Sequence, residues 1–277
     1  MAKMTEYTAA TRFDNGDILI KDGTNGTKKI TAANAAIEFA GLISTVNHRN
    51  VYRGKNLGTV ITDAQKETIR TGKFDDLFIG DYWTINGTRY DIADMDYWYN
   101  TGEDGHVFNK HHLVIIPHSQ LYTGKMNETN TTEGGYVGSY MYTEGLDQAA
   151  TKVSDDFGAM LLTHREYLVN AVTDGHPSGG AWLDRTVDLM NEIMVYGCHV
   201  HAPSSDGTTA YAKSTIDNTQ LAYFSLNPSN IHARQWYWLR DVVSPSYFAL
   251  VATFGSASCT YASYVDGVRP VFPIGVA

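Results

Sequence analysis

Cysteine is rare in this sequence, and its scarcity excludes several kinds of site. Only Cys198 and Cys259 occur among the 277 residues, and neither belongs to the CxxC or HExxH patterns typical of zinc sites. The first fifteen residues lack the apolar segment of a secretory signal, and proteins made without such a signal keep their thiols reduced. We therefore expect two free, buried cysteines, no metal, and synthesis in a cytoplasm.

Clusters of basic residues and long apolar runs are also missing. The 21 Lys and Arg residues are outnumbered by 30 Asp and Glu, and the formal net charge is −9. Nucleic acids and anionic membranes are bound by clustered Lys and Arg, and a membrane helix needs about 18 consecutive apolar residues. The sequence therefore predicts neither nucleic-acid binding nor membrane insertion.

The motifs of common catalytic sites are absent as well. There is no GxSxG elbow, no phosphate-binding P-loop and no Rossmann glycine pattern. His164 and Glu166 fit the edge of a packed segment. Four other histidines surround an apolar run without a carboxylate pair at fixed spacing, which favours a solvated loop over a general base. We expect no catalytic residue and no cofactor. The four histidines are His106, His111, His112 and His118.

The residues that are abundant indicate a folded, loop-rich protein. Hydrophobic residues make up 43% of the chain and aromatic residues 12%, with 18 Tyr and 25 Gly, whereas only 18% of residues are charged. This composition is far from that of a disordered chain and is typical of short strands, turns and ordered loops.

Residues 1–60 have the pattern of a small N-terminal module. An apolar run from Ile18 to Ile20 is followed by the turn pairs Asp22-Gly23 and Asn25-Gly26, which predicts a β-hairpin within residues 13–30. The Ala-rich residues 31–42 predict a short helix. We interpret this module as an attachment or oligomerisation unit.

A larger domain is predicted over residues 61–277. Residues 62–65, Thr-Asp-Ala-Gln, have the spacing of a capping box and start a brief helix. Asn86-Gly87 is a favoured hairpin turn and predicts a pair of strands within residues 82–93. The run LVIIP, residues 113–117, predicts a fully buried central strand.

The middle of this domain predicts one long loop and two helices. Residues 122–142 are rich in Thr, Asn and Gly and have no period, so we expect an ordered loop. Helical patterns occur over residues 145–157 and 183–196. In the second, Leu183 and Val187 lie on the same helical face.

The last part of the chain is unusual because it lacks charge. Between Val242 and Val265 there is no Lys, Arg, Glu, Gln or Asn. A surface rich in Tyr, Ser, Thr and Gly has the physical properties of an antibody paratope, since Tyr gives contact area with few rotamers to freeze. Composition alone leaves two alternatives, a binding surface or an ordinary packed strand pair.

Two arginines flank this uncharged segment. Arg240 and Arg269 each lie in a nearly apolar run, and arginines in such runs usually pair with a carboxylate. We expect partners such as Asp241 or Asp266 and a structural role for both arginines.

The motifs that contain these arginines resemble a known family. YWLRD, residues 237–241, and GVRPVF, residues 267–272, are similar to the paired motifs of the C-type-lectin-like fold shared with the formylglycine-generating enzymes, in its phage and prophage branch. IGDYW, residues 79–83, and PSGGAW, residues 177–182, add to the likeness, which covers roughly residues 60–277. The resemblance implies an α+β, C-type-lectin-like domain behind a small hairpin and helix module.

Some members of this family are the variable proteins of diversity-generating retroelements, in which the C-terminal segment is rewritten while the scaffold stays fixed. The resemblance implies a ligand-binding surface on the small and aromatic residues of the uncharged segment. These residues are Ser246, Tyr247, Phe248, Leu250, Thr253, Phe254, Ser256, Ser258, Thr260 and Tyr261.

The function implied by the resemblance is recognition by a bacteriophage particle. We expect a receptor-binding protein in the virion that contacts a host cell-surface protein or glycan, binds other virion proteins through residues 1–60, and forms a homo-oligomer, for which we favour a trimer. One alternative is a capsid decoration or tail protein without a host ligand, and another is a formylglycine-generating type of enzyme. The placement of Cys198 and Cys259 departs from the enzyme's reactive cysteine pair, and the calcium-binding lectin loop is missing.

Overall fold

The computed structural model describes residues 45–103, 105–203 and 219–276, together with two short strands nearer the N-terminus. Strand β1 (Ile18–Lys21) pairs antiparallel with β2 (Lys28–Thr31), so the hairpin predicted there is confirmed. The turn of this hairpin and nearly all of the helix predicted over residues 31–42 lie outside the described residues.

Two compact units make up the chain, residues 1–47 and residues 48–277. Residues 48–60 therefore belong to the second unit, although their polar composition suggested a boundary near residue 60. The buried side chain of Arg53 explains the difference, because its Nε donates to Asp81 Oδ1 at 3.0 Å. The backbone N–H of Leu57 also donates to the carbonyl of Tyr82, at 2.8 Å. The attachment role of residues 1–60 stays a prediction.

The capping box predicted at residues 62–65 is confirmed. Helix α2 (Asp63–Arg70) begins after Thr62, whose side chain accepts the Gln65 N–H while the Gln65 side chain accepts the Thr62 N–H. The short 3₁₀ helix η2 (Thr45–Asn50) precedes it.

The first sheet has five strands in the order β11-β16-β7-β4-β3, all paired antiparallel. Its turn between β3 and β4 contains Asn86 at φ 47° and Gly87 at φ 80°, which fits the predicted Asn-Gly hairpin. All six residues of the central strand β7 are buried, as predicted for LVIIP. The bounds are β3 (Tyr82–Ile85), β4 (Thr88–Met95), β7 (His112–Pro117), β11 (Asp188–Leu189) and β16 (Pro270–Gly275).

The second sheet also has five strands, in the order β14-β13-β12-β15-β8. Strands β12 and β15 pair in parallel, and the other pairs are antiparallel. Strand β8 lies inside residues 122–142, so the loop predicted there is only partly correct. The bounds are β8 (Tyr122–Gly124), β12 (Tyr237–Val242), β13 (Tyr247–Val251), β14 (Ala257–Tyr261) and β15 (Asp266–Val268).

The helix predicted over residues 183–196 is wrong for most of its length. Leu183 lies in β10 (His176–Arg185), which forms a long antiparallel hairpin with β9 (His164–Thr173). Only α4 (Glu192–Tyr196) is helical, and it begins after Asn191, whose side chain accepts the Met194 N–H. Leu183 and Val187 are spaced as in a helix, but Leu183 is half-buried in a strand and Val187 is buried outside any helix, because tertiary contacts override a short periodic pattern.

The remaining elements are short helices and one small hairpin. The helix predicted over residues 145–157 is confirmed as α3. These elements are β5 (Thr101–Glu103), β6 (His106–Phe108), η3 (Met141–Gly145), α3 (Asp147–Phe157), η4 (Gly158–Met160), α5 (Ala222–Leu226) and η6 (Pro228–Asn230).

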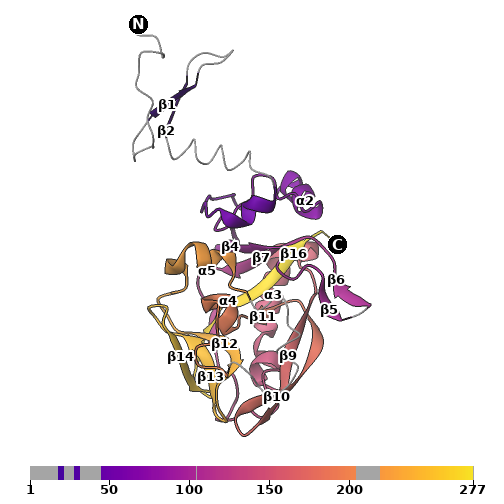
Figure 1. The fold of residues 1–277 in the computed structure, drawn as a ribbon, viewed down its shortest axis with the longest axis vertical. Helices are drawn as coiled ribbons and strands as arrows, with labels where there is room; N and C mark the ends of the chain where they lie inside the picture. The colour runs from indigo at the N-terminus through magenta and orange to yellow at the C-terminus, as the bar shows by residue number, and fades with distance from the viewer. Residues whose placement is uncertain (1–17, 22–27, 32–44, 104, 204–218, 277) are drawn as a thin grey trace. The chain divides into compact units, whose positions relative to one another are not determined.

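The architecture of the second unit is α+β, as predicted. The two sheets are largely antiparallel and the helices lie in separate stretches of the chain. Figure 1 shows β12, β13 and β14 grouped away from α2, with the β9–β10 hairpin nearby. None of the helices in the described part of the chain has the length and apolar character needed to cross a membrane.

Candidate functional site

The uncharged C-terminal segment forms the β13–β14 hairpin and is supported by a buried ion network. Arg240, on β12, donates to the carboxylate of Glu166 on β9 and lies 3.6 Å from a carboxylate oxygen of Asp188. His164 Nε2 lies 3.1 Å from the other Glu166 oxygen, and the Tyr136 hydroxyl donates to Asp188. The network joins β9, β11 and β12, so it fixes the hairpin's neighbouring strand to the rest of the domain.

The arginine keeps one of these acids ionised. Burial by itself raises the pKa of the Glu166 carboxyl, but the Arg240 charge and the His164 hydrogen bond outweigh it and lower the pKa to about 2. Burial and the Glu166 charge raise the pKa of Asp188 despite Arg240. The prediction that Arg240 would pair with Asp241 is therefore wrong, because its partners come from distant strands.

Within the part of the chain that the structure describes, Arg269 does not pair with a carboxylate as we expected. Its Nε donates to the Pro117 carbonyl at 3.0 Å, and its Nη1 donates to the Asn230 carbonyl at 3.2 Å. The guanidinium also lies 5.2 Å from the centre of the Tyr237 ring. Carbonyl oxygens and an aromatic ring thus replace Asp266 as the partners, while the structural role predicted for Arg269 agrees with its burial.

A second pair of buried acids orders the loop that follows α4. The Glu192 carboxylate accepts the backbone N–H groups of Val200, His201 and Ala202 at 2.8–3.0 Å. Asp241 accepts the Glu192 N–H at 2.7 Å. Burial and the nearby Glu192 charge raise the pKa of Asp241 to about 7, so this group changes its charge near neutral pH.

The substitution Asp241→Asn is expected to weaken the pH dependence of stability. The pKa of this carboxyl is about 7 in the folded protein and about 4 in the unfolded chain, so between these pH values the folded state holds an extra proton. The wild-type free energy of unfolding therefore rises as pH falls from about 7 toward about 4, and it is lowest once Asp241 is ionised. The amide remains neutral and still accepts the Glu192 N–H.

Urea unfolding at about pH 5 and about pH 8 tests this prediction. We expect the variant to gain stability relative to the wild type at the higher pH, and to lose that advantage at the lower pH. An equal difference between variant and wild type at both pH values would contradict the assignment.

Two residues predicted for the binding surface belong to the core instead. Phe248 and Leu250, on β13, both have an exposed fraction of 0%. Ala249 and Val251, which point to the opposite face of the strand, are equally buried. Strand β13 is therefore covered on both faces, so Phe248 and Leu250 cannot contact a ligand at the surface.

The exposed aromatic residues lie beside this buried strand. The rings of Tyr247 and Tyr261, paired across β13 and β14, are 4.5 Å apart in an edge-to-face arrangement. The Tyr264 ring lies 5.5 Å from that of Tyr261, and the two side chains are 53% and 37% exposed. We call Tyr247, Tyr261 and Tyr264 the tyrosine cluster. Tyr264 was not among the predicted site residues, although it lies in the same uncharged segment.

The tip of the β13–β14 hairpin presents a single large apolar side chain. Phe254 is 92% exposed, and Gly255 beside it adopts φ 88°. Ser256 is exposed, and Thr253 is half-buried. Ser246, Ser258 and Thr260, also predicted for the surface, are half-buried along the hairpin.

Neighbouring segments hold the turn before β13 in place. The backbone N–H of Thr132 donates to the Pro245 carbonyl at 3.0 Å, and the Thr132 hydroxyl donates to the Ser244 carbonyl at 2.8 Å. Gly175, in the β9–β10 turn at φ 80°, packs so closely on the Pro245 ring that a Cβ there would lie 2.2 Å from it. The surface therefore stands on a fixed scaffold, which favours binding because little order must be gained.

The cysteines and one histidine are placed differently from the predictions. Cys198 is exposed and Cys259 half-buried, and both are free, so the expectation of two buried cysteines is wrong. His112 is buried and stacks on Trp98 rather than lying in a solvated loop. Within the described residues, no three His, Cys, Asp or Glu side chains form a group that could hold a metal ion.

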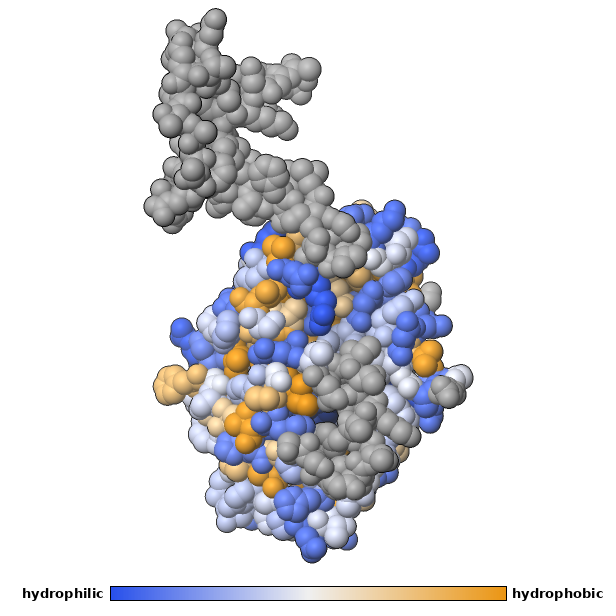
Figure 2. All heavy atoms as spheres, viewed as in Figure 1, coloured by the Kyte–Doolittle hydropathy of each residue, from blue (hydrophilic) through white to orange (hydrophobic). Residues whose placement is uncertain are grey.

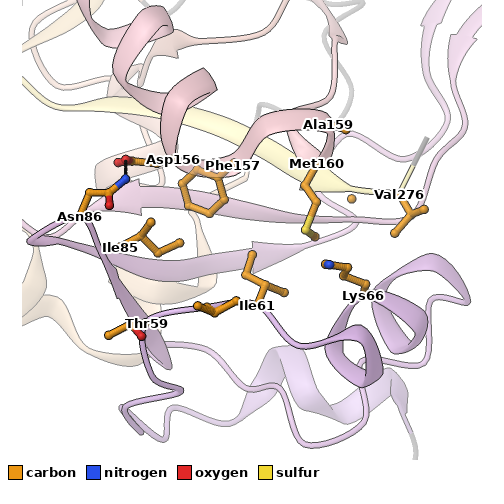
Figure 3. Close-up of a pocket in the computed structure, with 12 residues that line it drawn as sticks. Thr59, Ile61, Lys66, Ile85, Asn86, Asp156, Phe157, Ala159, Met160 and Val276 are labelled. Atoms are coloured by element: carbon orange, nitrogen blue, oxygen red, sulfur yellow. Dashed lines mark hydrogen bonds between the residues drawn. The ribbon is translucent and has the colours of Figure 1, made fainter.

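A separate pocket of about 650 Å³ lies between α2, the β3–β4 turn and the end of α3. Figure 3 shows Ile61, Phe157 and Met160 among the apolar side chains around it. Its two charged residues already have partners: Lys66 pairs with an aspartate of α2 at 3.0 Å, and Asp156 accepts a hydrogen bond from Asn86 at 2.8 Å. The pocket therefore offers mainly apolar contact.

Neither the apolar surface visible in Figure 2 nor a known relative identifies the site. On the face shown in Figure 2, hydrophobic residues form several small groups separated by hydrophilic ones. No protein-family model matches the sequence, and no curated protein or solved structure is detectably similar to it. The candidate site therefore rests on its own geometry: the tyrosine cluster and Phe254, uncharged, exposed and carried by the second sheet.

Proposed function

We propose that this protein is the recognition protein of a bacteriophage particle, with a C-type-lectin-like domain that binds a ligand on the host cell surface. The observation that carries the proposal is the exposed tyrosine cluster, together with Phe254, on a hairpin supported by buried ion pairs. Exposed aromatic side chains on a rigid support are the usual anchors of protein binding surfaces.

The surface also suits a segment that varies in sequence, as in the variable proteins of diversity-generating retroelements. Of the positions expected to vary, Ser256 is exposed and Ser258 and Thr260 are half-buried, so changes there leave the core intact. Changes at Phe248 or Leu250 would instead create cavities. We therefore infer that any diversification acts on the exposed side of the hairpin and on its tip.

The test is binding to intact cells from a panel of Gram-positive bacteria. The triple variant Phe254→Ala, Tyr261→Ala, Tyr264→Ala is expected to bind at least about tenfold more weakly than the wild type, because it removes the exposed aromatic anchors. The variant Val60→Ala, Val107→Ala, which shortens exposed apolar side chains elsewhere, serves as the control. Circular dichroism confirms that each protein is folded.

Equal binding by the wild type and the triple variant would remove the tyrosine cluster from the recognition surface. Absence of binding by the wild type to every strain would favour the alternative of a capsid decoration or tail protein without a host ligand. Attachment to the virion through residues 1–60, and trimer formation, are parts of the same proposal.

A further inference from the structure

Strand β14 is one edge of the second sheet, and backbone groups on its outer side have no backbone partner among the residues that the structure describes. On its inner side it pairs with β13 without a break, from Tyr247 opposite Tyr261 to Val251 opposite Ala257. Just beyond these ends, Ala262 N–H donates to the Ser246 carbonyl at 2.9 Å and Ala252 N–H donates to the Ser256 carbonyl at 2.8 Å.

These two end bonds determine which residues of β14 direct their backbone N–H and C=O groups away from β13. In an antiparallel pair, hydrogen-bonded and non-hydrogen-bonded residues alternate. Because Ala262 and Ser256 bond toward β13, so do Ser258 and Thr260, while Ala257 and Cys259 direct their N–H and C=O groups away from it. No backbone group in the described part of the chain pairs with the outward N–H groups of Ala257 and Cys259.

The first sheet shows how this protein covers an edge. Strand β3 is the last strand of that sheet, and residues 55–58 run along its outer side. Tyr82 N–H donates to the Lys55 carbonyl at 3.0 Å, Leu57 N–H donates to the Tyr82 carbonyl at 2.8 Å, and Thr84 N–H donates to the Gly58 carbonyl at 2.9 Å. The β3 edge of the first sheet is thus covered by residues 55–58 of the chain itself.

Strand β14 also lacks proline, charged residues and a bulge, three features that keep an edge from pairing. Its sequence, ASCTY, contains no Pro, no Lys and no other charged residue, and its register with β13 has no bulge. Natural sheets usually protect a free edge with one of these features. Figure 1 shows β14 as the outermost strand of its group. An edge of this kind is suited to accept another strand.

We propose that β14 binds an extended segment of a partner polypeptide, which adds to the sheet as a further strand. The inference rests on the proposed recognition function and specifies its ligand as a protein of the host surface rather than a glycan. Only a polypeptide carries N–H and C=O groups that repeat at the spacing of a strand, about 6.8 Å for every second residue. Tyr261, at the end of β14, contacts the side chains of the added segment.

Proline at residue 259 tests the edge without breaking the sheet. The Cys259 N–H points outward, so Cys259→Pro removes an edge donor and leaves the bonds between β13 and β14 in place, and proline is tolerated at such positions. Cys259→Ala is the matched control, because it also removes the thiol but keeps the N–H. Ala257→Pro applies the same test at the second outward residue, in case Cys259→Pro does not fold.

Binding to intact Gram-positive cells is measured for the full chain and these variants. We expect Cys259→Pro to bind at least about tenfold more weakly than Cys259→Ala. We also expect treatment of the cells with protease to abolish binding of the wild type, and periodate oxidation of their glycans to leave it unchanged. The protease and periodate results are obtained with the wild-type protein, so they do not depend on whether the variants fold.

The outcomes separate this inference from the function on which it rests. If periodate abolishes binding and protease does not, the ligand is a glycan, and the inference of a polypeptide ligand is overturned while the recognition function stands. Equal binding by Cys259→Pro and Cys259→Ala has the same consequence for the inference. A wild-type dimer that Cys259→Pro converts to a monomer with full cell binding assigns the edge to a second copy of this chain and also overturns it. If the wild type binds to none of the strains, both the recognition function and the strand-addition inference are overturned.

Discussion

Replacing Arg240 with Met is expected to lower the free energy of unfolding by about 3–5 kcal/mol. Met has a similar length but no charge, so Glu166 and Asp188 would remain buried without their cation. The pKa of Glu166, which is about 2 while Arg240 is present, would rise because burial would then be opposed by the hydrogen bond and charge of His164 without the arginine. Urea unfolding, monitored by circular dichroism, measures the loss.

An exposed ion pair provides the control for the loss of stability expected on replacing Arg240. Arg70 pairs with Glu67 on the surface of α2 at 2.7 Å, and ion pairs exposed to solvent contribute little to stability. Arg70→Met should therefore leave the urea midpoint almost unchanged. If the two substitutions had similar effects, the network around Arg240 would not be the support of β12 described above.

The second large effect is expected for Phe248→Ala, which should destabilise the protein by about 3–5 kcal/mol. The Phe248 ring is fully buried against the core, so its removal loses apolar contact and leaves a cavity. Phe254→Ala, in the same hairpin, removes the same atoms from a side chain that is 92% exposed, and stability should hardly change. Thermal and urea unfolding of the two variants measure the difference.

These two phenylalanines also separate stability from binding. At a temperature where both variants are folded, Phe248→Ala should bind cells like the wild type and Phe254→Ala should bind more weakly. The reverse order would place Phe248 in the binding surface and contradict the burial of β13.

Local signals in the sequence predicted local structure well. The capping box at Thr62 and Gln65 and the Asn86-Gly87 turn each depend on a few neighbouring residues, and the structure has both. LVIIP identified a buried strand because an apolar run of that length needs cover on both faces. Composition also singled out the segment that contains Tyr247 and Tyr261, since an uncharged segment rich in Tyr and Ser is uncommon, but it left open whether the segment was exposed or packed.

Features set by distant contacts were not predictable in the same way. Leu183 fits a helical pattern, but its partner in β9 is Glu166, far back in the sequence. Arg240 finds Glu166 and Asp188 rather than the adjacent Asp241. Phe248 was assigned to the surface because small and aromatic residues surround it, and nothing in the sequence indicates that both faces of β13 are covered. Such pairings are decided by the packing of whole elements.

The place of β16 in the first sheet has a consequence for how the protein is made. This strand follows the uncharged segment in the chain, yet it lies inside the sheet, between β11 and β7, with Phe272 opposite Ile115. A ribosome must therefore synthesise the whole β13–β14 hairpin before the core that supports it can close. A frameshift or stop codon within the hairpin would delete an interior strand as well. Only chains translated in frame through that hairpin would then contain β16, so a frameshift or stop codon there would yield unfolded protein rather than a folded domain with an altered hairpin.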